Sequence, residues 1–244
     1  MIGVILAAGA GTRLRPLTDD VPKPMIRLHG MPILEYNVRL LVRHGIADIV
    51  MNTWYKPEAI RAYFGDGSGF GARIAYSDER ELRGTAGALA PIRARLTEPF
   101  LVVYGDNLTD LDVAALCRTH RESGAEMTIA LFERDGVQAS GVAELAEDDR
   151  IVGFVEKPED GRRRGWVNAG VLCAQPDVLA YVPDDGPSDF GRDVIPALLR
   201  EGRRIQGYRM REHLWWIDTN EDYERTSADP DLLAFARDVA APRG

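Results

Sequence analysis

The stretch VILAAGAGTRLRPL, residues 4–17, is the most informative part of the chain about its fold. Its first five residues are apolar, which predicts a short strand buried on both faces. The chain then enters a loop in which Gly9 and Gly11 stand one residue apart, and glycines let backbone N–H groups approach a ligand closely. Arg13 and Lys23, the latter placed between two prolines, would bring two cations to the same loop. Backbone donors combined with an arginine and a lysine favour a polyphosphate ligand.

Two common phosphate-binding loops do not match this stretch. A dinucleotide fingerprint needs a third glycine at position 14, which is Leu14, so a dehydrogenase is disfavoured. A P-loop needs Gly-Lys-Ser/Thr after its glycines, and no such triplet follows. Residues 6–18, closing on Pro-Lys-Pro-Met at 22–25, instead resemble the signature of the sugar-1-phosphate nucleotidyltransferases. The resemblance extends over residues 1–226.

Apolar strands alternate with helical patterns along the chain, which predicts an α/β fold. We expect a Rossmann-like three-layer sandwich with a mixed, mostly parallel sheet and a small antiparallel insertion. The 244 residues suit one catalytic domain over 1–226 and a helical tail over 227–244. The predicted strands cover residues 4–8, 49–51, 74–76, 100–104, 127–132, 141–145, 151–155 and 205–210.

Composition excludes several classes of protein. A net charge of −8 argues against a general nucleic-acid binder. The sequence has no run of about 20 apolar residues, so no membrane partner is expected. We see no signal peptide and expect a cytoplasmic protein, in which Cys117 and Cys173 are buried thiols rather than a disulfide. A homo-oligomer is left open.

A second loop segment precedes a small-residue helix start. Residues 84–87 read Gly-Thr-Ala-Gly, a form that resembles the second nucleotide-contacting segment of the guanylyltransferases. A tight backbone contact that needs small residues would explain it equally well. Glu79 lies where the similar thymidylyltransferases have a glutamine. A carboxylate there would accept from the N–H groups of guanine and repel the carbonyl groups of uracil or thymine, which favours GTP.

An acid follows the strand over residues 100–104. The carboxyl end of a central strand is where open α/β sheets bind ligands, so Asp106 is a candidate for chemistry, and it resembles the metal-binding aspartate of the family. Asp106 could otherwise form a turn or cap a helix. Thr109 and Asp112 have the spacing of a capping box for the next helix, and this leaves Asp106 for the site.

The second candidate metal ligand is ambiguous in the sequence. Relatives often end the segment that corresponds to residues 215–221 with Asp-X-Gly-Thr-Pro-Glu, in which the aspartate is a metal ligand. One alignment places Trp216 at the position of that aspartate, whereas another places Asp218 there. Asp218 is the nearest acid either way, and Mg²⁺ sites take one or two carboxylates. The other interpretation makes Asp218 the N-cap of the following helix.

The resemblance implies transfer of a nucleotidyl group from a nucleoside triphosphate, GTP favoured, to a sugar-1-phosphate with Mg²⁺ as cofactor. The attacking phosphate is already anionic, so no general base is needed. Mannose, a heptose, glucose and a cyclitol remain open as the sugar. A uridylyl-, thymidylyl-, adenylyl- or cytidylyltransferase and a non-catalytic nucleotide-sugar-binding regulatory subunit are the alternatives.

The predicted site residues fall into four groups. Catalytic roles are assigned to Arg13, Lys23 and Asp106, and metal binding to Asp106 and Asp218. Nucleotide binding is assigned to Leu6, Ala8, Gly9, Gly11, Thr12, Glu79, Gly84 and Thr85. Binding of the sugar phosphate is assigned to Asn107, Gly141, Glu156, Lys157 and Asn168.

Overall fold

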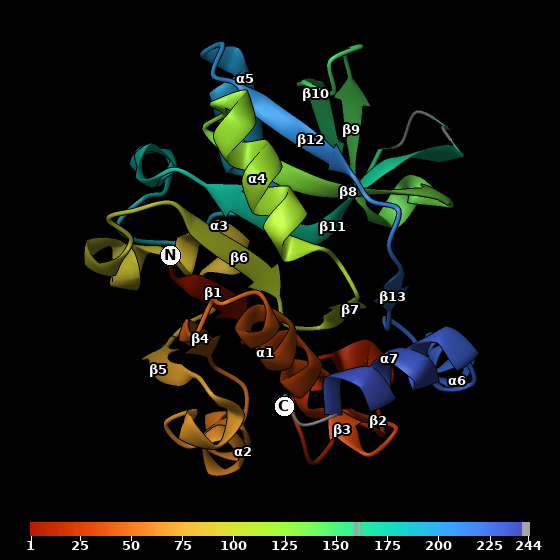
Figure 1. The fold of residues 1–244 in the computed structure, drawn as a ribbon. Coiled ribbons are helices and arrows are strands. Elements are labelled where there is room, and N and C mark those ends of the chain that lie inside the picture. Colours follow the sequence, from red (N-terminus) through yellow and green to blue (C-terminus); the bar gives the residue numbers. More distant parts are fainter. Residues whose placement is uncertain (159–160, 162, 241–244) are drawn as a thin grey trace. The chain divides into compact units, whose positions relative to one another are not determined.

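The computed structural model describes residues 1–158, 161 and 163–240 (Figure 1). Residues 241–244, the end of the predicted tail, lie outside the described residues. The chain divides into two compact units. Unit 1 comprises residues 1–2, 81–102 and 112–212, and unit 2 comprises residues 3–80, 103–111 and 213–244. The assignment of residues 1–226 to one catalytic domain stays a prediction.

Unit 2 is built on three parallel strands. β4 (Asp48–Thr53) lies between β1 (Gly3–Leu6) and β5 (Arg73–Asp78). The register aligns Leu6 of β1 with Asn52, and Asn52 with Ser77 of β5. The connections carry α1 (Ile33–Arg43) and α2 (Pro57–Phe64), as expected for parallel neighbours. The carboxyl ends of the three strands therefore meet at one edge.

The first strand is shorter than predicted. It ends at Leu6, although Ala7 and Ala8 are buried as the apolar run suggested. The Ala7 backbone N–H donates to the side-chain oxygen of Asn52, at 2.7 Å. The Asn52 side chain thus accepts the hydrogen bond that the Ala7 N–H would otherwise donate to a neighbouring strand.

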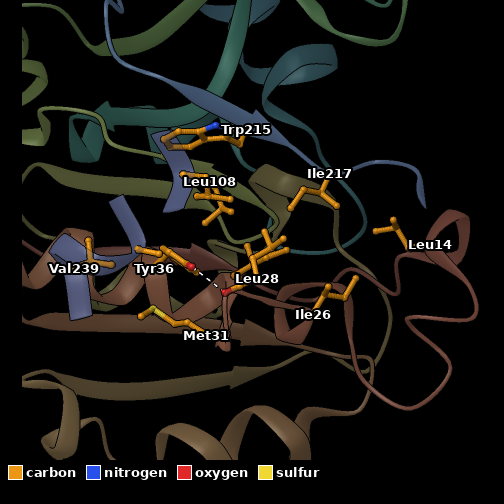
Figure 2. Close-up of a cluster of buried hydrophobic side chains, with 12 residues drawn as sticks. Leu14, Ile26, Leu28, Met31, Tyr36, Leu108, Trp215, Ile217 and Val239 are labelled. Atoms are coloured by element: carbon orange, nitrogen blue, oxygen red, sulfur yellow. Dashed lines mark hydrogen bonds between the residues drawn. The ribbon is translucent and has the colours of Figure 1, made fainter. Parts of the chain in front are cut away.

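The C-terminal segment completes unit 2. β13 (Leu214–Trp216) pairs antiparallel with β7 (Asn107–Thr109), and β2 (Arg27–Leu28) pairs antiparallel with β3 (Met31–Pro32). The helices α6 (Asn220–Ser227) and α7 (Pro230–Ala240) follow. Figure 2 shows the apolar cluster that joins these parts, in which the Tyr36 hydroxyl donates to the Leu28 carbonyl at 2.9 Å. α7 contributes to the cluster with three buried side chains, Leu232, Ala236 and Val239.

Unit 1 contains a mostly antiparallel sheet. β8 (Met127–Asp135) pairs antiparallel with β11 (Arg164–Ala174) and parallel with β12 (Ile205–Arg209). β9 (Gly141–Leu145) and β10 (Ile151–Glu156) form the predicted antiparallel ribbon, which continues the sheet through β11. The helices of this unit are α3 (Gly84–Gly87), α4 (Val113–Ser123) and α5 (Ile195–Arg200). β6 (Phe100–Tyr104) runs from unit 1 into unit 2.

The predicted α/β fold, with a mixed sheet and an antiparallel insertion, is confirmed. Cys117 and Cys173 are buried free thiols, also as predicted. The capping box is wrong: Thr109 lies in β7, and Asp112 caps α4 by accepting from the Ala115 N–H at 2.9 Å. Within the described residues, no helix combines the length and apolar character that crossing a bilayer requires.

Candidate active site

The loop after β1 positions Lys23 through close packing against Gly11. Gly11 has φ +63, and a Cβ there would lie 2.6 Å from the Lys23 Cβ. The Gly11 carbonyl accepts from the Thr18 hydroxyl at 2.9 Å, which closes the loop. Only glycine satisfies both the positive φ and the contact. The sequence pattern suggested backbone approach to a ligand, but the close approach seen at Gly11 is to the lysine of the same chain.

Two strand pairings bring Asp106 and Asp218 together. The Gly105 N–H donates to the Leu6 carbonyl at 2.9 Å, so Asp106 lies beside the end of β1. In the antiparallel ladder Trp216 pairs with Asn107, and the chain beyond Trp216 therefore runs back toward Asp106. Two acids separated by more than a hundred residues in the sequence thus approach the same point.

That point is the ammonium group of Lys23. Its Nζ lies 2.8 Å from Asp106 Oδ2 and 3.0 Å from Asp218 Oδ1. Burial acts to lower the pKa of Lys23, but attraction by Asp106 and Asp218 and the hydrogen bonds to them outweigh it, so the pKa is raised. Lys23 therefore stays charged at neutral pH. Arg13 adds a more exposed cation, with a guanidinium nitrogen 3.4 Å from Asp218 Oδ1.

The N-cap of α6 is Thr219, the residue after Asp218. Thr219 caps α6: its hydroxyl accepts from the Asp222 N–H at 3.1 Å, and the Asp222 carboxylate accepts from the Thr219 N–H at 3.0 Å. This is a reciprocal capping box. The carboxylate of Asp218 is therefore directed to Lys23 and Arg13 rather than to the helix end.

The pair of carboxylates fits a divalent cation. Both already reach one positively charged nitrogen, so they converge closely enough to share a cation. Within the described part of the chain, no three His, Cys, Asp or Glu residues gather as a fuller metal cage. Mg²⁺ is commonly bound by one or two carboxylates and completes its shell with water and substrate phosphates. Asp106 and Asp218 are the residues that would hold it.

Glu79 is buried at the same edge of the unit 2 sheet. Its backbone N–H donates to the Thr53 carbonyl at 2.8 Å, and its Oε1 accepts from Asn52 Nδ2 at 2.8 Å. Asn52 was not among the predicted site residues. The signal for it was a polar residue directly after the apolar strand 49–51, at the carboxyl end where such sheets bind ligands.

The segment Gly84–Gly87 is held by residues 188–190 in unit 1. Asp189 Oδ1 accepts from both the N–H and the hydroxyl of Thr85, each at 3.1 Å, and the same hydroxyl accepts from the Phe190 N–H at 3.0 Å. The hydroxyl of Thr85 thus both donates and accepts inside the protein. Gly84 has φ +74, and a Cβ there would lie 2.6 Å from the Ser188 carbonyl oxygen. The tight backbone contact considered from the sequence is present.

We expect Gly84→Ala to destabilise the protein by about 2–4 kcal/mol, since it adds left-handed strain and a clash with Ser188. The matched control is Gly202→Ala, because Gly202 has φ +67 but a Cβ at that position would have no atom within 4 Å. The control should cost about 1 kcal/mol from strain alone. Urea unfolding midpoints measure both, and equal losses would contradict the close approach.

Among the predicted sugar-phosphate residues of unit 1, Gly141 lies directly against Glu156. A Cβ on Gly141 would lie 2.6 Å from Glu156 Oε2, and a Cβ on Gly191 would lie closer still to the same oxygen. Burial raises the pKa of Glu156, against the attraction of Lys157 and Arg192. Asn168 uses its Oδ1 to accept from the Gly170 N–H at 2.8 Å.

The remaining candidates lie in unit 2. Gly9 and Thr12 are exposed, Leu6 and Asn107 are half-buried and Ala8 is buried. Unit 2 therefore brings together Lys23, Asp106, Asp218 and Arg13, and unit 1 brings together Gly141 and Glu156. The ligand-binding role of each residue stays a prediction.

The α/β fold of this chain thus carries a glycine loop, a buried lysine and two carboxylates that converge on that lysine. A family model described as nucleotidyl transferase matches residues 2–225, and the chain belongs to that family. The resemblance drawn from the sequence is thereby confirmed.

Individual relatives agree on the family and differ in the base. The chain is 37% identical over 228 residues to a mannose-1-phosphate guanylyltransferase of Mycobacterium tuberculosis, covering 93% of this chain and 63% of the relative. It is 35% identical over 233 residues to a UTP–glucose-1-phosphate uridylyltransferase of Synechocystis, covering 89% and 60%. The chain thus spans less than two thirds of these relatives. The crystal structure of a putative glucose-1-phosphate thymidylyltransferase from Bacillus anthracis has the same fold, with a TM-score of 0.86 at 22% identity, covering 100% of this chain and 98% of that one.

Proposed function

We propose that this chain transfers a nucleotidyl group from a nucleoside triphosphate to a sugar-1-phosphate. An oxygen of the sugar phosphate forms a bond to the α-phosphorus, and the bond to the bridging β-phosphate oxygen breaks. Pyrophosphate leaves with the electron pair, and an NDP-sugar remains. The observation that carries the proposal is the convergence of Asp106 and Asp218 on Lys23 Nζ, at 2.8 and 3.0 Å.

The chain's residues have distinct tasks in this reaction. The difficulty is that an anion must approach a polyanion, and the remedy is positioning and neutralisation of charge. Lys23 would hold the α-phosphate, and the more exposed Arg13 would stabilise charge on the departing pyrophosphate. The nucleophile is already anionic, so none of the histidines has to act as a general base.

Asp106 and Asp218 would hold Mg²⁺. The ion, when bound, neutralises charge on the reacting phosphates. The residues proposed to bind the nucleotide, besides Glu79, are Leu6, Ala8, Gly9, Gly11, Thr12, Gly84 and Thr85. The residues proposed to bind the sugar phosphate are Asn107, Gly141, Glu156, Lys157 and Asn168.

GTP is the nucleotide that we propose. Glu79 provides carboxylate acceptors, which suit the N1–H and N2–H donors of guanine. The Mycobacterium tuberculosis relative named as a guanylyltransferase supports this choice, whereas the Synechocystis relative is named for UTP. Mannose-1-phosphate is the first sugar phosphate to test.

The deciding experiment is a matrix of five nucleoside triphosphates, ATP, CTP, GTP, UTP and dTTP, against mannose-1-phosphate, glucose-1-phosphate and a heptose-1-phosphate. Pyrophosphate release is measured with Mg²⁺ and with EDTA. We expect release only when both substrates and Mg²⁺ are present, and fastest with GTP. Preference for another nucleotide would reject GTP and leave the reaction class standing.

A nucleotide-sugar-binding regulatory subunit is the competing function. Retention of Arg13, Lys23, Asp106 and Asp218 in one cluster favours the enzyme, since a binding subunit has no need of this charge arrangement. Tight binding of an NDP-sugar without turnover in any cell of the matrix would favour the regulator.

A further inference from the structure

Residues 188–191 of unit 1 contact residues that the proposed function assigns to different substrates. The start of this segment accepts hydrogen bonds from Gly84–Gly87, which begins with two residues proposed for the nucleotide. At the end of the segment, Gly191 lies against the carboxylate of Glu156, which is proposed for the sugar phosphate. One short segment of the chain therefore borders both sets of proposed ligands in unit 1.

Ser188 holds the backbone of Gly84–Gly87 through its own backbone. Its carbonyl accepts from the N–H groups of Ala86 and Gly87, each at 2.9 Å. Its N–H donates to the Arg83 carbonyl at 2.8 Å. Backbone groups that are paired in this way cannot shift without losing their partners, so Ser188 sets the position of the segment.

Asp189 holds the remaining residue of that segment, Thr85. Its Oδ1 accepts from both the N–H and the hydroxyl of Thr85, each at 3.1 Å, and the Phe190 N–H donates to the same hydroxyl at 3.0 Å. A hydroxyl has a single proton, which Thr85 donates to Asp189, so its side chain serves to hold the backbone. Asp189 is itself held, because its N–H donates to Asp193 Oδ2 at 2.7 Å.

Gly191 makes room for the carboxylate of Glu156. A Cβ on Gly191 would overlap Glu156 Oε2 and would lie 3.1 Å from Glu156 Cδ. Gly191 does not have a positive φ, so alanine fits its backbone. The atoms in the way are the end of a flexible side chain, and a methyl group at position 191 would therefore displace the carboxylate rather than strain the chain.

We propose that Asp189 and Gly191 are positioning residues for the two substrates. Asp189 fixes the backbone at residues 84–87 for the nucleotide, and Gly191 fixes the carboxylate of Glu156 for the sugar phosphate. The proposal rests on the nucleotidyl-transfer function above. A single turn of π-helix, Phe190–Val194, begins directly after Asp189 and contains Gly191, and such turns are frequent at functional sites.

Asp189→Ala should raise the KM for the preferred nucleotide by about tenfold and leave the KM for the sugar phosphate and kcat nearly unchanged. The substitution removes two hydrogen bonds that hold Thr85, and a loosened binding segment weakens ground state and transition state equally. Asp189→Asn should restore the KM, because its Oδ1 can still accept from both groups of Thr85. It loses only the exposed ion pair with Arg192, at 3.9 Å, and such pairs contribute little.

Gly191→Ala should give the opposite pattern. We expect the KM for the sugar phosphate to rise by about tenfold, because the displaced Glu156 carboxylate loses hydrogen bonds to the sugar, while the KM for the nucleotide stays within twofold of the wild type. Gly69→Ala is the matched control, since Gly69 also lacks a positive φ and a Cβ there would have no atom within 4 Å. It should change neither KM.

Two further variants separate positioning from stability. Asp112→Ala removes another aspartate that accepts from a backbone N–H, that of Ala115 at 2.9 Å, and it should lower the urea unfolding midpoint without changing either KM. Thr85→Val removes the hydroxyl between Asp189 and Phe190, and it should raise the nucleotide KM severalfold. This second variant keeps the test decisive if Asp189→Ala folds poorly.

The outcomes separate this inference from the function on which it rests. If the wild type releases no pyrophosphate from any substrate pair, the proposed function fails. If the wild type is active but Asp189→Ala and Gly191→Ala leave both KM values unchanged, or raise both together in step with a loss of stability, the inference is overturned. A rise confined to the nucleotide in the first variant and to the sugar phosphate in the second supports it.

Discussion

Asp106→Asn is expected to lower the kcat of Mg²⁺-dependent pyrophosphate release by about 10³-fold. The substitution removes a carboxylate charge from the pair that converges on Lys23, while the asparagine keeps nearly the same volume. The protein should therefore stay folded and should need more Mg²⁺ for half-maximal rate. Steady-state rates over a Mg²⁺ titration, with circular dichroism as a check of folding, measure both effects.

Asp110→Asn is the matched control for Asp106→Asn. It makes the same charge change four positions away, where the carboxylate accepts from the backbone N–H and ring Nδ1 of His213, at 2.6 and 2.9 Å. This variant should lose some stability but keep the rate and the Mg²⁺ dependence. Unchanged turnover in Asp106→Asn would remove Asp106 from the metal site. Asp218→Asn should resemble Asp106→Asn if both carboxylates hold the ion.

Lys23→Met is expected to lower kcat by about 10²–10³-fold, because it removes a cation proposed to contact the α-phosphate. The same substitution should strengthen Mg²⁺ binding, although it lowers the rate. In the structure the ammonium of Lys23 contacts both carboxylates, and the Lys23 side chain is 7% exposed. Loss of that charge should tighten Mg²⁺ binding without nucleotide by roughly tenfold, from the repulsion that a unit charge exerts on a divalent ion a few ångströms away.

Titration calorimetry with MgCl₂ measures this second effect, and single-turnover assays measure the first. Lys56→Met is the control, since Lys56 is an unrelated cation of unit 2 that donates to the Asp19 backbone carbonyl. It should change neither quantity. Weaker Mg²⁺ binding together with the rate loss in Lys23→Met would mean that the lysine supports the local structure of the site rather than competing with the metal for the two carboxylates.

Local patterns were sufficient to predict most elements of the fold. The strand predicted at 100–104 matches β6, and the ribbon predicted at 141–145 and 151–155 matches β9 and β10 closely. These predictions depend on apolar periodicity and turn residues, which act between near neighbours in the chain. They are weakest where a distant side chain competes for a backbone group, as Asn52 does for the Ala7 N–H.

Caps could not be assigned reliably from spacing alone. Thr109 and Asp112 match a capping box by spacing, yet Thr109 donates its hydroxyl to the His213 carbonyl at 2.7 Å, a partner more than a hundred residues away. Strand pairing between β7 and β13 decides this. Beyond β13, Thr219 is the N-cap of α6, and the carboxylate of Asp218 reaches Lys23.

The sequence alone was sufficient to infer the family and the α/β class. It also identified Lys23 and Asp106 as candidate site residues, because neighbouring residues in the sequence form a recognisable pattern around each of them. The folded chain was needed to show that Asp218 reaches the same cation as Asp106, that Gly11 makes room for Lys23 and that Asn52 holds Glu79. These three contacts join residues from 12 to 195 positions apart. Such contacts depend on the register of paired strands and on the packing of loops, and no local pattern encodes either of them.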